Sequence, residues 1–157
     1  MTIDIPKYKE LFRQRDVRET ETSTSAVTGT LYWSCSGCNF IPLNPDVNDV
    51  SYSQASSYVQ ADADNISFVA PVFLPHGAVV TSVIVYGNAG ASAETWILSR
   101  ATLNSSIVAT MATNTINSSD STITDATIIN NTRSYFLQTS SLDTGDRIFG
   151  VRIIYTI

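Results

Sequence analysis

Residues 79–86 read Val-Val-Thr-Ser-Val-Ile-Val-Tyr, and residues 148–155 read Ile-Phe-Gly-Val-Arg-Ile-Ile-Tyr. Both stretches are rich in β-branched and aromatic residues and alternate as β-strands do. Similar segments recur along the chain, and clusters of turn-forming residues such as Leu74-Pro75-His76-Gly77 separate them. The expected strands cover residues 27–33, 50–59, 66–73, 78–86, 95–100, 107–113, 122–129, 135–139 and 147–156.

Eight or nine short strands with no helices between them predict an all-β fold, an antiparallel β-sandwich or jelly roll. A parallel α/β fold is excluded because the chain offers no crossover helices. The 157 residues suffice for one domain with a sizeable core. Alternation alone does not fix which face of each strand points inward. The residues expected to form most of the core are Val72, Val79, Val83, Val85, Ile97, Leu98, Phe136, Ile148, Val151 and Ile153.

Charge divides the chain into two parts, because ten of its 23 charged residues lie within residues 1–21. We therefore expect a charged N-terminal arm with a polar linker over residues 1–25 and a sandwich domain over residues 26–157. The arm is expected to be short, helical or extended, and to dock either on its own domain or on a larger assembly such as a capsid or filament. Its candidate contact residues are Tyr8, Leu11, Phe12, Arg13 and Arg15.

The composition of the chain argues against several classes of function. A net charge of -5 and a pI near 4.6 argue against a nucleic-acid-binding surface. No apolar run approaches the roughly 18 residues of a membrane span, and the first residues lack the pattern of a secretory signal. With one histidine and two cysteines the chain is poor in catalytic side chains, so we expect neither an enzyme nor a bound cofactor.

The motif Cys35-Ser36-Gly37-Cys38 has the spacing of redox and zinc sites. A redox pair needs a helix that the β context does not supply, and a zinc site needs more ligands than one chain offers. The pattern therefore favours structural thiols or a local disulfide over a metal shared between chains, and over redox chemistry.

Two acidic clusters are candidate calcium ligands: Asp46 with Asp49, and Asp62 with Asp64. Neither matches the EF-hand loop, and Asp is also an ordinary turn residue, which is the favoured interpretation. Residues 143–145 match the Asp-Thr-Gly triplet of aspartic proteases, but too little chain follows them, so they are expected to form a turn.

The runs at residues 68–78, 95–100, 135–137 and 150–155 resemble a pattern in uncharacterised bacterial and phage-associated β-domains. The layout is also similar to the trimeric jelly rolls of the tumour-necrosis-factor and complement-head type. The resemblance covers residues 66–157 and implies a fold without implying any catalytic residue.

The favoured functional hypothesis is a structural, self-assembling protein: a capsid-decoration or fibre component of a virion, or a subunit of another extracellular assembly. A closed homotrimer is expected, with interface candidates Val151, Ile153 and Tyr155. The alternative hypothesis is an extracellular or cell-surface carbohydrate-binding jelly roll, which binds its sugar with or without the assistance of calcium. Its candidate sugar-stacking residues are Trp33, Tyr52, Tyr58 and Trp96.

Overall fold

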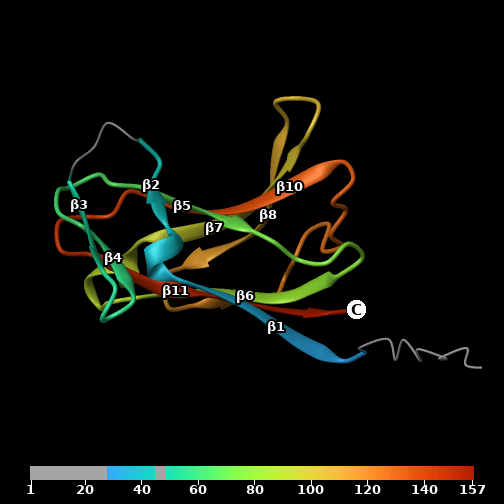
Figure 1. Ribbon diagram of the computed structural model, residues 1–157, viewed down its shortest axis with the longest axis horizontal. Coiled ribbons are helices and arrows are strands. Elements are labelled where there is room, and N and C mark those ends of the chain that lie inside the picture. The colour runs from blue at the N-terminus through green and yellow to red at the C-terminus, as the bar shows by residue number, and fades with distance from the viewer. Residues whose placement is uncertain (1–27, 45–48) are drawn as a thin grey trace, which may run out of the picture.

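The computed structural model describes residues 28–44 and 49–157. Within these residues the chain folds into two antiparallel sheets packed face to face as a β-sandwich jelly roll (Figure 1). The expected arm, with its candidates Tyr8, Leu11, Phe12, Arg13 and Arg15, lies outside the described residues. The division into arm and body therefore stays a prediction.

The first sheet has the strand order β3-β4-β11-β6-β9, and β1 also pairs with β11. The strands of this sheet are β1 (Thr30–Ser36), β3 (Val50–Ser53), β4 (Tyr58–Ala61), β6 (Val79–Gly87), β9 (Ser119–Asp120) and β11 (Arg147–Thr156). Strand β11 lies between β6 on one side and both β1 and β4 on the other. It therefore connects most of the first sheet.

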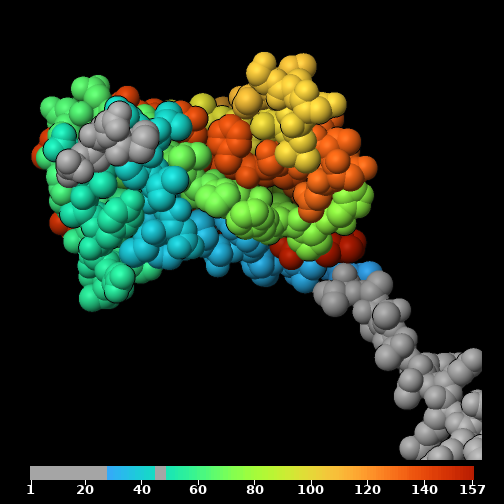
Figure 2. All heavy atoms as spheres, turned by 45° about the horizontal axis from the view of Figure 1, so that its top comes forward, coloured from blue at the N-terminus to red at the C-terminus, as the bar shows by residue number. Residues whose placement is uncertain are grey.

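The second sheet has the strand order β2-β5-β10-β7-β8. Its strands are β2 (Ile41–Pro42), β5 (Phe68–Val72), β7 (Thr95–Thr102), β8 (Val108–Thr115) and β10 (Arg133–Thr139). Two short 3-10 turns, η1 (Gly37–Asn39) and η2 (Gly90–Ala93), complete the described elements. Figure 2 shows the tip of the β7–β8 hairpin standing out from the body. In the described part of the chain, no helix has the length and apolar character needed to cross a membrane.

The core lies between the sheets and contains seven of the ten residues expected there. The expectation is wrong for Val79, Ile97 and Phe136. Ile97 precedes the buried Leu98, so strand alternation turns it to the outer face, and Phe136 alternates in the same way with its buried neighbours. Val79 alternates with the buried Val80 and is exposed.

The expected strand at residues 122–129 is instead an irregular segment that closes one end of the sandwich. Its backbone bonds to both sheets: Thr124 N–H donates to Met111 O of β8, and Val80 N–H of β6 donates to Ala126 O. Residues 50–59 form the two strands β3 and β4 rather than one strand. These differences arise because the backbone partners of a segment depend on the tertiary fold.

Two of the expected oligomer-interface residues lie inside the chain's own core. Val151 is 2% exposed and Ile153 is 0% exposed, because the second sheet covers the inner face of β11. Their side chains cannot reach a neighbouring subunit, so the interface prediction is wrong for both. Tyr155 is half-buried and packs against the core. The homotrimer itself stays a prediction.

Gly37 generates a stability prediction, because η1 packs against β11 at this position. A Cβ atom at Gly37 would lie 1.9 Å from the carbonyl oxygen of Ile148 and 3.0 Å from Cα of Tyr58. Since backbone atoms cannot move aside like a flexible side chain, Gly37→Ala is expected to lower the free energy of unfolding by about 3 kcal/mol or more. Chemical denaturation measures this change.

Gly77→Ala is the matched control. Gly77 has a φ of +85° and nothing within 4 Å of a built Cβ, so only backbone strain remains, which costs about 1 kcal/mol. Equal destabilisation by the two variants would contradict the close-packing argument.

Candidate functional site

The outer face of the first sheet carries a regular grid of side chains across β1, β11 and β6. Gly150 of β11 lies between Ser36 of β1 and Tyr86 of β6. Two residues further along, Arg152 lies beside Ser34. These residues share the outer face because they alternate with the buried Val151 and Ile153.

A β-bulge at Phe149 adds an aromatic ring to this face. The pairing of β11 with β6 shifts between Ile148 and Gly150, so Phe149 is the extra residue. Ile148 and Val151 are three positions apart, yet both are buried. The bulge makes this spacing possible and leaves the side chain of Phe149 41% exposed.

A hollow of about 590 Å³ lies over this part of the sheet, and we call it the aromatic hollow. Tyr32, the most exposed of its rings at 64%, lines it together with Phe149 and Tyr86. The polar side chains in its lining are Ser34 and Arg152.

Gly150 lies in the lining of the aromatic hollow, where the backbone of β11 comes close to that of Cys35. A Cβ atom there would lie 2.5 Å from the carbonyl oxygen of Cys35, and the φ of +153° disfavours other residues. A glycine at this position therefore permits the close approach of the two backbones.

Polar side chains hold the rings around the aromatic hollow. The guanidinium of Arg147 lies 4.7 Å from the ring centroid of Tyr58, and the Tyr58 ring meets Phe149 edge-on at 6.3 Å. Arg147 Nε donates to Gln60 Oε1 at 2.6 Å. The guanidinium of Arg152 lies 5.9 Å from the ring centroid of Tyr86. These contacts place guanidinium groups, which are hydrogen-bond donors, beside the aromatic rings.

The aromatic residues expected to stack on sugars mostly lie elsewhere. Trp96 is 0% exposed, and its Nε1–H donates to backbone oxygens of Thr115 and Ser118, so the expectation is wrong for Trp96. Trp33 is half-buried and packs against the core. Tyr52 is exposed, but its hydroxyl donates to Phe40 O.

Among those expected residues, Tyr58 borders the aromatic hollow through its contact with Phe149. Tyr32, Tyr86 and Phe149 were not among the residues predicted from the sequence. Tyr32 could have been found from its alternation with Leu31 and Trp33, whereas the position of Phe149 depends on the bulge.

Cys35 and Cys38 are both free thiols. Burial raises the pKa of Cys35 to about 11, so its reactive thiolate is scarce at neutral pH. The Cys38 thiol contacts the backbone oxygens of Ser53 and Tyr58, each at 3.6 Å. The structure has the thiols without the local disulfide, while a metal shared between chains stays untested.

The carboxylates of Asp62 and Asp64 accept hydrogen bonds from other residues of the chain. Asp64 accepts hydrogen bonds from the backbone N–H and the hydroxyl of Thr144, which lower the pKa of its carboxyl. Asp62 accepts from the side chains of Ser51 and Gln60. Within residues 28–44 and 49–157, no three His, Cys, Asp or Glu side chains gather as a metal site would require. Asp46 lies outside the described residues, and Asp49 O accepts from Asp62 N–H.

The Asp-Thr-Gly triplet at residues 143–145 forms a turn, as expected. Asp146 N–H donates to Asp143 O at 3.0 Å, and Gly145 supplies a φ of +91°. His76 is also a turn residue, whose Nδ1 accepts from Asn130 N–H.

No protein-family model matches this chain, and no curated protein sequence matches it. Similar solved structures include the C-terminal CBM6 of LamC, a marine laminarinase from Zobellia galactanivorans. It is 9% identical, with a TM-score of 0.49 over 78% of this chain and 98% of that one. Another is a xylan-binding module, CBM15, which is 16% identical, with a TM-score of 0.43 over 82% of this chain and 97% of that one.

This comparison corrects the favoured functional hypothesis. Both structures are carbohydrate-binding modules, and neither is a virion component or a tumour-necrosis-factor-like protein. The prediction of a capsid-decoration or fibre protein is therefore wrong, and the resemblance to phage-associated domains is not confirmed. The β-sandwich expected for residues 66–157 is confirmed by the fold.

The burial of Cys35 predicts slow thiol chemistry. In a Cys38→Ser variant, the rate of alkylation by iodoacetamide is expected to rise with pH toward a midpoint near 11 rather than near the ordinary value of 9. A Cys35→Ser variant measures the contribution of Cys38. A rate that reaches its plateau by pH 9 would contradict the assigned burial.

The acidic clusters predict a metal-independent fold. Because Asp62 and Asp64 already accept hydrogen bonds from the chain, the melting temperature is expected to be unchanged by EDTA and by added calcium. A fall of several degrees in EDTA that calcium reverses would show a bound ion.

Proposed function

We propose that this protein is a non-catalytic carbohydrate-binding module that acts outside the cell or at its surface, with the aromatic hollow as its sugar-binding site. The supporting observation is the cluster of Tyr32, Tyr86 and Phe149 around Gly150, with Arg152 beside it. The proposed site differs from the set of sugar-stacking residues expected from the sequence, in which Trp96 is buried.

The chemistry of a sugar ring suits this surface. A pyranose ring has an apolar face of C–H groups and a rim of hydroxyl groups. The exposed rings of Tyr32 and Phe149 offer flat apolar area, while the Arg152 guanidinium donates hydrogen bonds and the Ser34 hydroxyl donates or accepts them. The volume of about 590 Å³ lies within the range of small-ligand sites, roughly 300–1,000 Å³.

The sheet holds the binding groups in place before a ligand arrives. Tyr32, Arg152 and Tyr86 come from three hydrogen-bonded strands, and the contact between Tyr58 and Phe149 restrains the bulged ring. A site that is ordered in advance loses less conformational entropy on binding. Short segments of a polysaccharide are the ligands that this surface fits.

The proposal assigns no catalytic step to the aromatic hollow. Glycoside hydrolysis commonly requires two carboxyl groups on either side of the scissile bond. The residues that line the hollow include no Asp, Glu or His among those described. We therefore keep the expectation that the protein binds sugars without cleaving them.

Binding assays with single-ring variants test the proposed site. A glycan array, read in EDTA and in calcium, first identifies a polysaccharide that the full chain binds. Tyr32→Ala and Phe149→Ala are each expected to weaken that binding by about 2- to 12-fold, because a stacked ring contributes about 0.5–1.5 kcal/mol. Isothermal titration calorimetry measures the change.

Phe73→Ala is the matched control, since Phe73 is 76% exposed but does not line the aromatic hollow. Its affinity is expected to equal that of the unaltered protein. Absence of any glycan binding would contradict the proposed function. Binding that Phe73→Ala weakens while Tyr32→Ala and Phe149→Ala do not would place the site elsewhere.

A further inference from the structure

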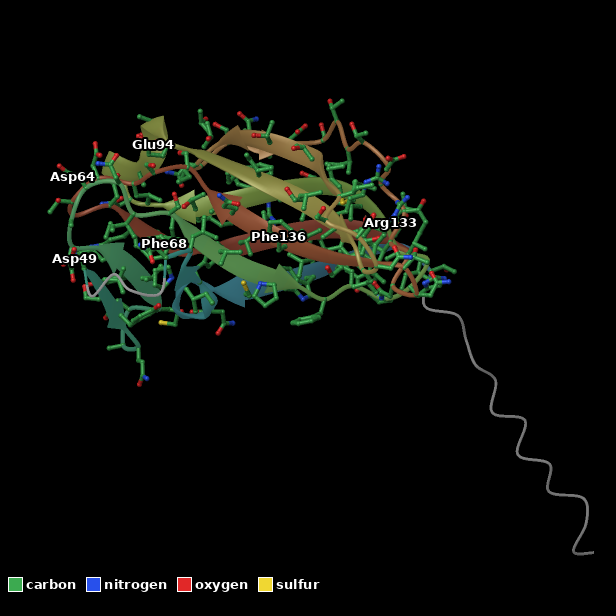
Figure 3. The ribbon with its side chains drawn as sticks, turned by 90° about the horizontal axis from the view of Figure 1, so that it is seen from above. Asp49, Asp64, Phe68, Glu94, Arg133 and Phe136 are labelled. Atoms are coloured by element: carbon green, nitrogen blue, oxygen red, sulfur yellow. The ribbon has the colours of Figure 1, made fainter. Side chains whose placement is uncertain are left out.

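A second, smaller hollow lies near the sandwich end that the segment at residues 121–132 closes, and we call it the arginine hollow. Its volume is about 220 Å³, and it is lined by Arg100, Thr102, Ile107, Ala109 and Arg133. Figure 3 shows Arg133 at the end of the molecule opposite Asp49 and Asp64. The arginine hollow thus lies far from the acidic turns and does not share a lining residue with the aromatic hollow.

Strand pairing places both arginines on the inner face of the second sheet. Arg100 pairs with Tyr135, whose side chain belongs to the core, and Thr102 pairs with Arg133. Arg100 also follows the buried Leu98 by two positions, so it continues the inner face of β7 beyond the apolar core. Two guanidinium groups therefore occupy positions where a sandwich usually has apolar side chains.

The described residues pair one of these two arginines with a carboxylate. Arg100 Nη2 forms an ion pair with Asp125, which belongs to the closing segment. Arg100 Nη1 is buried and has no hydrogen-bond partner among the described residues. The salt bridge among the described residues joins Arg100 to Asp125. The side chain of Arg133 forms neither an ion pair nor a hydrogen bond with any described residue.

Leaving the buried Arg100 Nη1 without a partner is unfavourable. A buried donor without a partner costs about 1–3 kcal/mol, and more when the group is charged. Native structures satisfy such groups with protein atoms, ordered water or a bound ion. The guanidinium group is a planar fork of donors whose geometry matches the oxygens of carboxylates, sulfates and phosphates.

We propose that the arginine hollow binds an oxyanion group, held by Arg133 and beside Arg100, which lines the same hollow. The volume of about 220 Å³ accommodates one such group rather than a whole sugar chain. The ligand class is therefore a small sulfate, phosphate or carboxylate, either free or as a substituent of a larger molecule. This site does not depend on the sugar-binding proposal, because its residues and its chemistry are different.

Thermal unfolding of the full chain in defined salts tests this site. Sodium sulfate is compared with sodium chloride at equal ionic strength, and sodium phosphate and sodium acetate identify the preferred oxyanion. At a saturating concentration in the millimolar range, the preferred anion is expected to raise the melting temperature by about 3 °C above chloride. Sulfate also stabilises proteins without binding a site, so the comparison between variants decides the question.

Arg133→Met removes the charge and keeps most of the apolar stem. Because Arg133 has no ionic partner among the described residues, this variant breaks no ion pair there and is expected to fold. The saturable part of the stabilisation is expected to disappear in this variant. Arg133→Lys keeps the charge without the planar fork and should retain a reduced effect. Lys7→Met, in the charged stretch at residues 1–21, is the control for loss of one positive charge and should respond like the unaltered protein.

Two results would overturn the proposal. One is an equal response to all anions after correction for ionic strength. The other is an unchanged, saturable response in Arg133→Met.

Discussion

Strand β11 is hydrogen-bonded along both edges, and the first sheet depends on this one strand. It pairs with β6 over nearly its whole length, while β1 and β4 share its other edge. A strand in this position has to satisfy its backbone groups on both sides, so it cannot shift without breaking several pairings at once. The order of the aromatic hollow follows from this constraint, because Phe149, Gly150 and Arg152 are consecutive or nearly consecutive positions on β11.

The sequence predicted those parts of the fold in which local pattern and tertiary pairing agree. The expected strand at residues 147–156 has the bounds of β11, and the strand expected at 78–86 is nearly β6. Periodicity did not reveal which face is inside, so Val79 and Ile97 were assigned to the wrong side. The residues at 122–129 are rich in β-branched side chains, yet their backbone groups bond to both sheets and form no strand.

The candidate sites were harder to predict from the sequence. In each site, the register of strand pairing brings together residues that form no sequence motif. Tyr32, Tyr86 and Phe149 are far apart in the sequence and meet only because β1 and β6 flank β11. Arg100 and Arg133 likewise meet through the pairing of β7 with β10. By contrast, the Cys35–Cys38 spacing was visible in the sequence, but its two thiols are partly buried and unpaired with one another.

The bulge at Phe149 also has a consequence for how such a surface changes during evolution. Because side chains alternate with a period of two, removing the one extra residue would bring Ile148 and Val151 to ordinary spacing, with both still directed inward. The core would keep its composition, while the outer face would lose a ring. The outward position of this ring thus depends on one extra residue in the strand. Deletion of a single codon would remove the ring, and insertion of one could create it, without any substitution in the surrounding residues.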